Sequence, residues 1–325
     1  MRIQPSPRSR SLRRAPARSW LIACGVIGCG AFAAPPPQTP VTLPAGWLRT
    51  AGFGVSEQWP TRLENGGDMR WSAWRVEAGV IRPRPEGWTL GGGIQYIVQD
   101  FRFDAPPAFG GVEPWERVDA LSLSFFANPR LPDPWTLRIS PSVRMSHEFS
   151  ADTHDAWAYG LVVSAQGRVH PTLQLGFGAG VFRDLERTRG FPLLAVDWRP
   201  TDSFRVTNPR PAGPAGPAGL EASWSIRPEW TLGLGASYYS DRFRLQDHPD
   251  REEDIGQWRG VPAWLRASWR KGPFQATLLA GYILSGELKT ETEGGRTLIK
   301  EDADPAPFAA MVISIPLHLR PPPRP

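Results

Sequence analysis

Apolar and polar residues alternate along most of the chain, in short segments separated by polar, Gly-rich or Pro-rich stretches. Residues 172–184 are a clear example. One set is apolar and the other small or polar: Leu173, Leu175, Phe177, Ala179 and Val181 against Gln174, Gly176, Gly178 and Gly180. A period of two places successive side chains on opposite faces of an extended strand. The pattern predicts strands with one apolar face and one small, polar or charged face.

A short motif marks where several of these strands begin. Trp88-Thr89-Leu90 recurs as Trp135-Thr136-Leu137 and Trp230-Thr231-Leu232, and as Thr172-Leu173 without the Trp. A turn containing Pro precedes each copy. Pro favours a tight turn, so each copy predicts a strand that leaves a short turn.

The segments predict an all-β fold of about 14 strands. They lie at residues 47–58, 70–82, 88–103, 117–128, 135–149, 157–169, 172–184, 190–199, 204–208, 220–227, 230–244, 258–270, 273–289 and 308–319. If 190–199 and 204–208 do not form a hairpin, the count falls to 12. Long and short connections alternate, as in outer-membrane barrels, which have an even strand count. We therefore predict a single antiparallel up-and-down transmembrane β-barrel.

The tryptophans give an independent indication of a membrane. Interfacial aromatic residues mark both ends of transmembrane strands. The turn-side set is Trp47, Trp88, Trp135, Trp198 and Trp230, and the loop-side set is Trp59, Trp71, Trp157 and Trp258, with Trp115 just before a strand. A soluble β-sandwich is the alternative, but it would hold its tryptophans in mid-strand.

The N-terminus has the features of an export signal. Arginines precede an apolar run at residues 20–30, and Ala31-Phe32-Ala33 forms a cleavage signature. We predict a signal peptide at residues 1–33, a Pro-rich leader at 34–46, the barrel at 47–319 and a Pro-rich tail at 320–325. Lipoprotein anchoring at Cys29 is the minor alternative. The longest apolar stretch, residues 276–284, is about half a helical membrane span, so a helical span is not expected.

Removing the signal peptide changes the charge balance. Six of the 37 basic residues and none of the 32 acidic ones lie in it, which leaves 31 against 32. The mature chain is therefore close to neutral, and its high isoelectric point is no sign of nucleic-acid binding. Both cysteines, Cys24 and Cys29, also lie in this segment. We expect no disulfide and no cofactor.

The best candidates for function are polar residues on the predicted inner face. Interior charges in a barrel either line water or pair with one another and fill the lumen. These lumen-lining candidates are Arg75, Glu77, Gln95, Arg138, Arg144, Gln174, Glu221, Arg266 and Arg270.

Two loop features give weaker hypotheses. A cluster at residues 247–254 could hold a divalent cation, although it lacks the spacing of a calcium loop. It comprises Asp247, Asp250, Glu252, Glu253 and Asp254. The pairs at residues 152–155 and 302–304 loosely resemble the Asp and His pairs of outer-membrane proteases, in reverse chain order. The five histidines have no metal-binding spacing, and we expect no metal site.

Three features together resemble a known family. They are the exported leader, the repeated Pro-x-Trp-Thr-Leu hairpins, and residues 190–200, Gly-Phe-Pro-Leu-Leu-Ala-Val-Asp-Trp-Arg-Pro. They are similar to a bacterial outer-membrane barrel family catalogued only as a domain of unknown function. The resemblance covers nearly all of the mature chain and implies a barrel, but no activity. The last predicted strand departs from the common barrel pattern, because it lacks a terminal aromatic residue.

These observations predict an outer-membrane barrel that contacts lipid or lipopolysaccharide. The first functional hypothesis is a narrow channel for small solutes, with arginines favouring anions. The second is a barrel that does not transport and whose loops bind lipopolysaccharide or a partner. An outer-membrane hydrolase is the last alternative.

Overall fold

The computed structural model describes residues 47–83, 88–129, 131–247 and 254–317. The predicted signal peptide, the leader and the tail at 320–325 lie outside these residues. The described strands begin at Leu48 and end at Pro316, close to the predicted barrel limits.

The alternating segments form long strands. Their bounds are β1 Leu48–Arg62, β2 Asp68–Pro83, β3 Thr89–Asp104, β4 Arg117–Asn128, β5 Trp135–Glu148, β6 Trp157–His170, β7 Leu173–Asp184, β8 Arg187–Trp198, β9 Phe204–Thr207, β10 Ala218–Arg227, β11 Trp230–Arg244, β12 Ile255–Lys271, β13 Phe274–Glu291, β14 Thr297–Ala303 and β15 Ala306–Pro316. One 3-10 turn, Pro107–Phe109, interrupts the connection between β3 and β4. None of the described helices could span a membrane.

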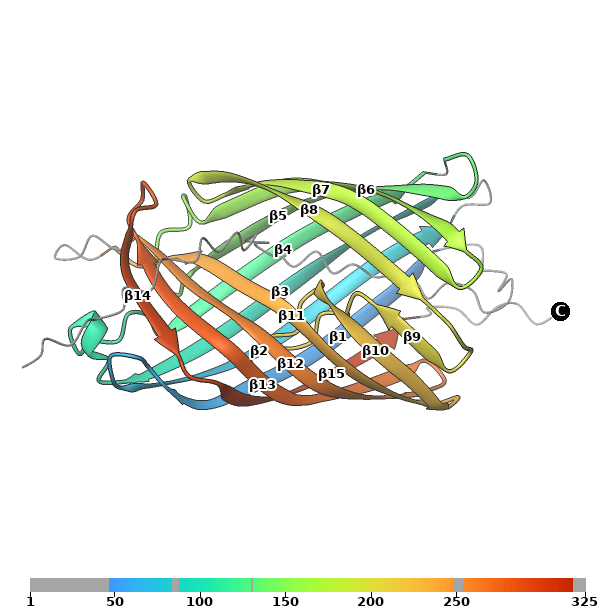
Figure 1. Ribbon diagram of the computed structural model, residues 1–325. Coiled ribbons are helices and arrows are strands. Elements are labelled where there is room, and N and C mark those ends of the chain that lie inside the picture. Colours follow the sequence, from blue (N-terminus) through green and yellow to red (C-terminus); the bar gives the residue numbers. More distant parts are fainter. Residues whose placement is uncertain (1–46, 84–87, 130, 248–253, 318–325) are drawn as a thin grey trace, which may run out of the picture.

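The strands close into an antiparallel barrel (Figure 1). Consecutive strands pair from β1 to β13, and β15 joins β13 to β1. β14 pairs with β13 beyond the end of β15, so it continues β15 outward rather than adding a strand to the wall. The wall therefore has 14 strands, and the prediction of 14 rather than 12 is confirmed.

The apolar face of the strands is exposed around the barrel. Large apolar side chains at alternate positions are exposed on neighbouring strands, such as Phe177, Val181, Leu194, Leu234 and Leu265. Trp230 and Trp269 pair at the turn-side end of β11 and β12, and Leu234 and Leu265 pair farther along. A broad exposed apolar band on a closed barrel is the surface that a bilayer covers. The fold is a transmembrane β-barrel.

Two connections differ from the predicted pattern. The connection from β7 to β8 is only Leu185 and Glu186, so the loop predicted at residues 185–189 is wrong and the alternation of long and short is not strict. The long polar loop predicted at residues 290–307 is also wrong, because it contains β14. Leu288 and Lys289 pair with Glu301 and Lys300 in this hairpin. These pairs mix polar and apolar residues without a regular alternation, so no strand was predicted there.

Three tryptophans assigned to the loop-side girdle lie elsewhere. Trp71, Trp115 and Trp258 are buried inside the barrel rather than exposed at an interface. Trp59 and Trp157 are exposed, as are Trp47, Trp88, Trp198 and Trp230 at the turn side. The girdle prediction is therefore right for four of the five turn-side residues, with Trp135 half-buried, and wrong for these three loop-side residues.

Candidate functional site in the barrel interior

The outer ends of β11 and β12 lean into the barrel. Every residue from Ser240 to Phe243 is buried, although alternate residues of a wall strand would face outward. Arg244 pairs with His147 of β5, a strand far around the wall from β11. The Gln246 backbone N–H donates to Glu148 at the end of β5. We call residues 239–247 and 254–260 the lid, because they reach across the loop-side mouth.

Arg242 fastens the lid to the β7–β8 end of the wall. Only 3% of its side chain is exposed. Its guanidinium contacts Asp184 Oδ2 at 3.0 Å, Glu186 Oε1 at 3.0 Å and Glu291 Oε2. Asp184 and Glu186 belong to the β7–β8 end, and Glu291 ends β13. One buried cation therefore holds together three carboxylates from two distant parts of the rim.

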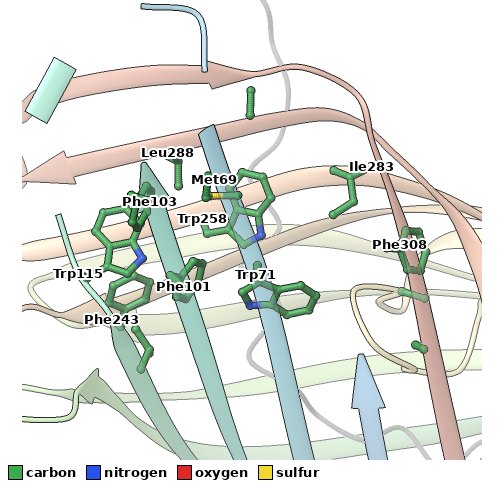
Figure 2. Close-up of a cluster of buried hydrophobic side chains, with 14 of the residues drawn as sticks. Met69, Trp71, Phe101, Phe103, Trp115, Phe243, Trp258, Ile283, Leu288 and Phe308 are labelled. Atoms are coloured by element: carbon green, nitrogen blue, oxygen red, sulfur yellow. The ribbon is translucent and has the colours of Figure 1, made fainter. Parts of the chain in front are cut away.

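Aromatic side chains from the lid, β2, β3 and the loop before β4 fill the loop-side part of the lumen (Figure 2). We call this set the aromatic cluster: Trp71, Phe101, Phe103, Trp115, Phe243 and Trp258. Trp115 lies edge-on to Phe243 at 5.2 Å and to Phe103 at 5.6 Å. These contacts join the lid to β3 and to the loop before β4. The inner face is apolar here, contrary to the prediction of a polar inner face throughout.

The β9–β10 connection, residues 208–217, turns into the lumen, and we call it the inner loop. Arg75 Nη2 donates to Pro211 O at 2.8 Å, and Arg266 Nη2 donates to Arg210 O at 2.9 Å. Gly213 has a φ of 54°, and a Cβ there would lie 2.7 Å from Ala310 Cβ. A glycine is needed both for this conformation and for the close approach to β15.

Three of the predicted lumen residues, Arg144, Glu221 and Arg266, form buried or nearly buried ion pairs. Arg144 contacts Asp241 of the lid at 2.6 Å. Arg266 Nε contacts Glu221 Oε2 at 2.7 Å, and Trp264 Nε1 donates to the same oxygen at 2.8 Å. Arg75 is also buried and donates to Pro211 O of the inner loop at 2.8 Å.

The other candidates are spread over the wall. Gln95 Nε2 donates to Glu77 at 3.3 Å, and Arg270 Nη2 donates to Gln275 at 3.0 Å. Arg138 lies over the Phe126 ring, 4.5 Å from its centre. Gln174 of β7 lies opposite Asp197 of β8 and Arg168 of β6. The structure brings Arg75, Glu221 and Arg266 together at the inner loop and leaves these others apart.

The predicted loop sites are not assembled in the described residues. Asp250, Glu252 and Glu253 lie outside them, while Asp247 and Asp254 each approach Arg244 at 3.6 Å. No group of three potential metal ligands gathers within the described ranges.

Residues 152–155 and 302–304, the two segments of the hydrolase hypothesis, each contact residues close to themselves in the described structure. His154 Nδ1 lies 3.2 Å from its neighbour Asp155, and both side chains are exposed. Lys300 contacts Asp302 at 3.1 Å and Glu287 at 3.2 Å. Burial lowers the pKa of Lys300, but these two carboxylates outweigh it and hold the pKa above its ordinary value.

Sequence reasoning missed the residues that close the mouth. Gln99 Nε2 donates to Asp241 at 2.6 Å, and Tyr239 donates to Gln99 at 3.1 Å. The sequence did contain a sign that β11 leaves the wall. Arg242 and Arg244 occupy the positions that would face lipid if the alternation of β11 continued. Charged residues there indicate that the strand has left the membrane surface.

Comparison with solved structures finds several outer-membrane proteins at low similarity. No protein-family model and no curated protein matches the sequence. The resemblance to a family of unknown function therefore stays a prediction. The COG4313 outer membrane channel from Pseudomonas putida F1 is 8% identical, with a TM-score of 0.44, covering 87% of this chain and 99% of its own.

The toluene transporter TodX of P. putida is also 8% identical, with a TM-score of 0.43, 86% of this chain covered and 92% of its own. The toluene transporter TbuX of Ralstonia pickettii has 8% identity and a TM-score of 0.36, with 85% and 91% covered. Values this low say nothing about substrate. The closed wall of 14 strands with its exposed apolar band identifies this chain as an outer-membrane β-barrel protein.

Proposed function

We propose that the barrel is a channel for small solutes whose mouth is closed by the lid. The observation that carries this proposal is the inner wall on the turn side of the aromatic cluster. Small or polar residues at inward positions there include Ser140, Ser142, Gly176, Gly178, Gly233 and Gly235, while the Trp264 ring lies over Gly235. Where the inward side chains are this small, part of the lumen of a wide barrel is left to water rather than filled.

The inner loop narrows this passage. Arg75 and Arg266 donate to its backbone, Arg210 belongs to it, and Glu77 and Glu221 lie nearby with the opposing charge. Positive charge slightly exceeds negative charge at the narrowest part. Charged rings at a constriction set ion selectivity, so a mild preference for anions is expected.

Planar-bilayer recording tests the proposal. We expect wild-type protein to open rarely, and Arg242→Ala, which releases the lid, to conduct readily with an anion-selective reversal potential. Arg75→Gln should move that potential toward cations, because one positive charge leaves the constriction. Arg183→Gln, on the exposed face of β7, is the control and should leave selectivity unchanged. Folded Arg242→Ala protein without conductance would end the channel proposal.

The closed mouth also supports a second candidate, a barrel that does not transport and binds lipopolysaccharide or a partner through its loops. The ion pairs of the lid and the aromatic cluster would then be permanent. The same recordings separate the two proposals, since a permanent closure predicts no conductance from the wild type or from Arg242→Ala.

A further inference from the structure

The wall is broken between β8 and β10. β9 is only four residues long and pairs with β8 at Asp197 and Trp198 alone. In the described part of the chain, no strand pairs with β8 on this side from Arg187 to Val196. β10 begins at Ala218, opposite Tyr238, and the rest of β11 leans into the mouth as the lid. We call this region the wall break.

Side chains adapt β8 to the loss of a partner strand. Asn208 accepts from the Val196 N–H at 2.9 Å and donates to Leu194 O at 3.2 Å and to Gly219 O at 3.1 Å. Its amide therefore ties β8 to β10 where the strands separate. The backbone of Pro192 has the same orientation as that of Leu194 and Val196. Because Pro has no N–H, position 192 leaves no unpaired donor on the side of the break.

The wall break extends through most of the apolar band of the membrane, including its outer half. Trp198 marks the turn-side interface of β8. Tilted strands advance roughly 2.5 Å per residue along the membrane normal, so about ten residues cross the apolar band. The N–H groups of Thr188 and Gly190 face the break, where no strand of the described residues pairs with β8. A lipid-packed wall leaves no backbone group unpaired, so this edge is not a sealed wall.

The inner face of β8 is apolar beside the break. Phe191, Leu193 and Ala195 face inward, whereas β5 presents Ser and Arg and β7 presents Gly at inward positions. Phe191 stacks on Phe182 at 5.6 Å, with Val162 packed against them. Because the outward face of β8 is also apolar, an apolar surface runs through the wall from lipid to lumen.

The lid lies beyond the outer end of the break. Arg242 meets Asp184 and Glu186 where β7 turns into β8. The break therefore leads to the lumen on the turn side of the closed mouth. A solute that used it would come from the outer leaflet rather than from the external water.

We propose that apolar or amphiphilic small molecules dissolved in the outer leaflet enter the lumen sideways through the wall break. The proposal rests on the channel function, since the solute leaves through the turn-side end of the lumen. It gives the substrate class as molecules with an apolar part small enough to pass between β8 and β10.

The test uses cells with a lipopolysaccharide outer leaflet and N-phenyl-1-naphthylamine, an uncharged aromatic dye that fluoresces in phospholipid. Wild-type protein should speed dye influx over cells without it. Leu193→Trp should slow this influx roughly tenfold, because overpacking a narrow passage raises its barrier by an amount of that order. Ser164→Trp is the matched control. Ser164 of β6 faces inward and pairs with Gly178 of β7, which in turn pairs with Leu193, but β6 has a partner strand on both sides.

The outcomes separate this route from the channel itself. Slower influx in Leu193→Trp but not in Ser164→Trp supports the wall break, and equal slowing by both overturns it. Conductance from Arg242→Ala without any wild-type dye influx overturns the sideways route alone, while absent conductance overturns the channel. Ala195→Phe replaces Leu193→Trp if the latter lacks the gel shift of a folded barrel. Asn208→Ala should raise influx, since it removes the tie between β8 and β10.

Discussion

Arg242→Ala is expected to destabilise the folded barrel by about 3–5 kcal/mol, the usual effect of removing one partner from a buried ionic cluster. The substitution leaves Asp184, Glu186 and Glu291 facing one another without their cation. Their repulsion should push the lid from the β7–β8 rim. The urea midpoint of protein folded in lipid vesicles measures the loss, and the expected rise in open time in planar bilayers reports the released mouth.

Arg259→Ala is the matched control for this effect. Arg259 lies on the same lid and contacts a single carboxylate, Glu287 of the adjacent β13, at 2.6 Å. Its side chain is 29% exposed, so a loss below about 1 kcal/mol is expected. Equal effects of the two substitutions would contradict the role of Arg242 in fastening the mouth.

Glu221→Ala should have an effect of similar size on the inner loop. Glu221 accepts from both Trp264 Nε1 and Arg266 Nε, and the Glu221 and Arg266 side chains are each 9% exposed. Removing it leaves a nearly buried guanidinium without its carboxylate, at a cost of about 3–5 kcal/mol. Arg266 also holds Arg210 O, so the inner loop should loosen and single-channel current should increase in the Arg242→Ala background.

Two variants make this prediction specific. Glu221→Gln keeps an acceptor for Trp264 and should lose less stability than Glu221→Ala. Glu229→Ala, in the exposed β10–β11 turn, should stay within about 0.5 kcal/mol of the wild type. A Glu221→Ala protein with wild-type stability and current would contradict the proposed support of the inner loop.

The wall could be predicted from sequence because lipid imposes a rule on every second residue. Leu232, Leu234 and Ala236 alternate with Thr231, Gly233 and Gly235, and the strand follows from this pattern alone. β14 was not predicted, because its paired residues, such as Lys300 and Lys289, lie beyond the lipid and need no apolar face. The two-residue β7–β8 turn escaped because Leu185, with a φ of 55°, has no turn signature.

The interior follows no such rule. The alternation along each strand identified the inward positions. Their partners, however, are set by contacts between residues distant in sequence, such as Gln99 with Asp241 or Arg75 with Pro211. Nothing local indicates that residues 208–217 turn inward or that the aromatic cluster fills the mouth. The same limit applies to the wall break, which depends on where β9 stops.

Leu265→Arg tests most directly whether the exposed apolar band faces lipid. Leu265 is 66% exposed and pairs with Leu234, well inside the Trp230–Trp269 pair. In a bilayer the substitution should reduce the folding free energy by roughly 2–4 kcal/mol. Val112→Arg, at an exposed position in the β3–β4 loop, should change it by less than about 0.5 kcal/mol. Urea titration in lipid vesicles measures both, and equal, near-zero effects would mean that water covers this surface and the barrel does not span a membrane.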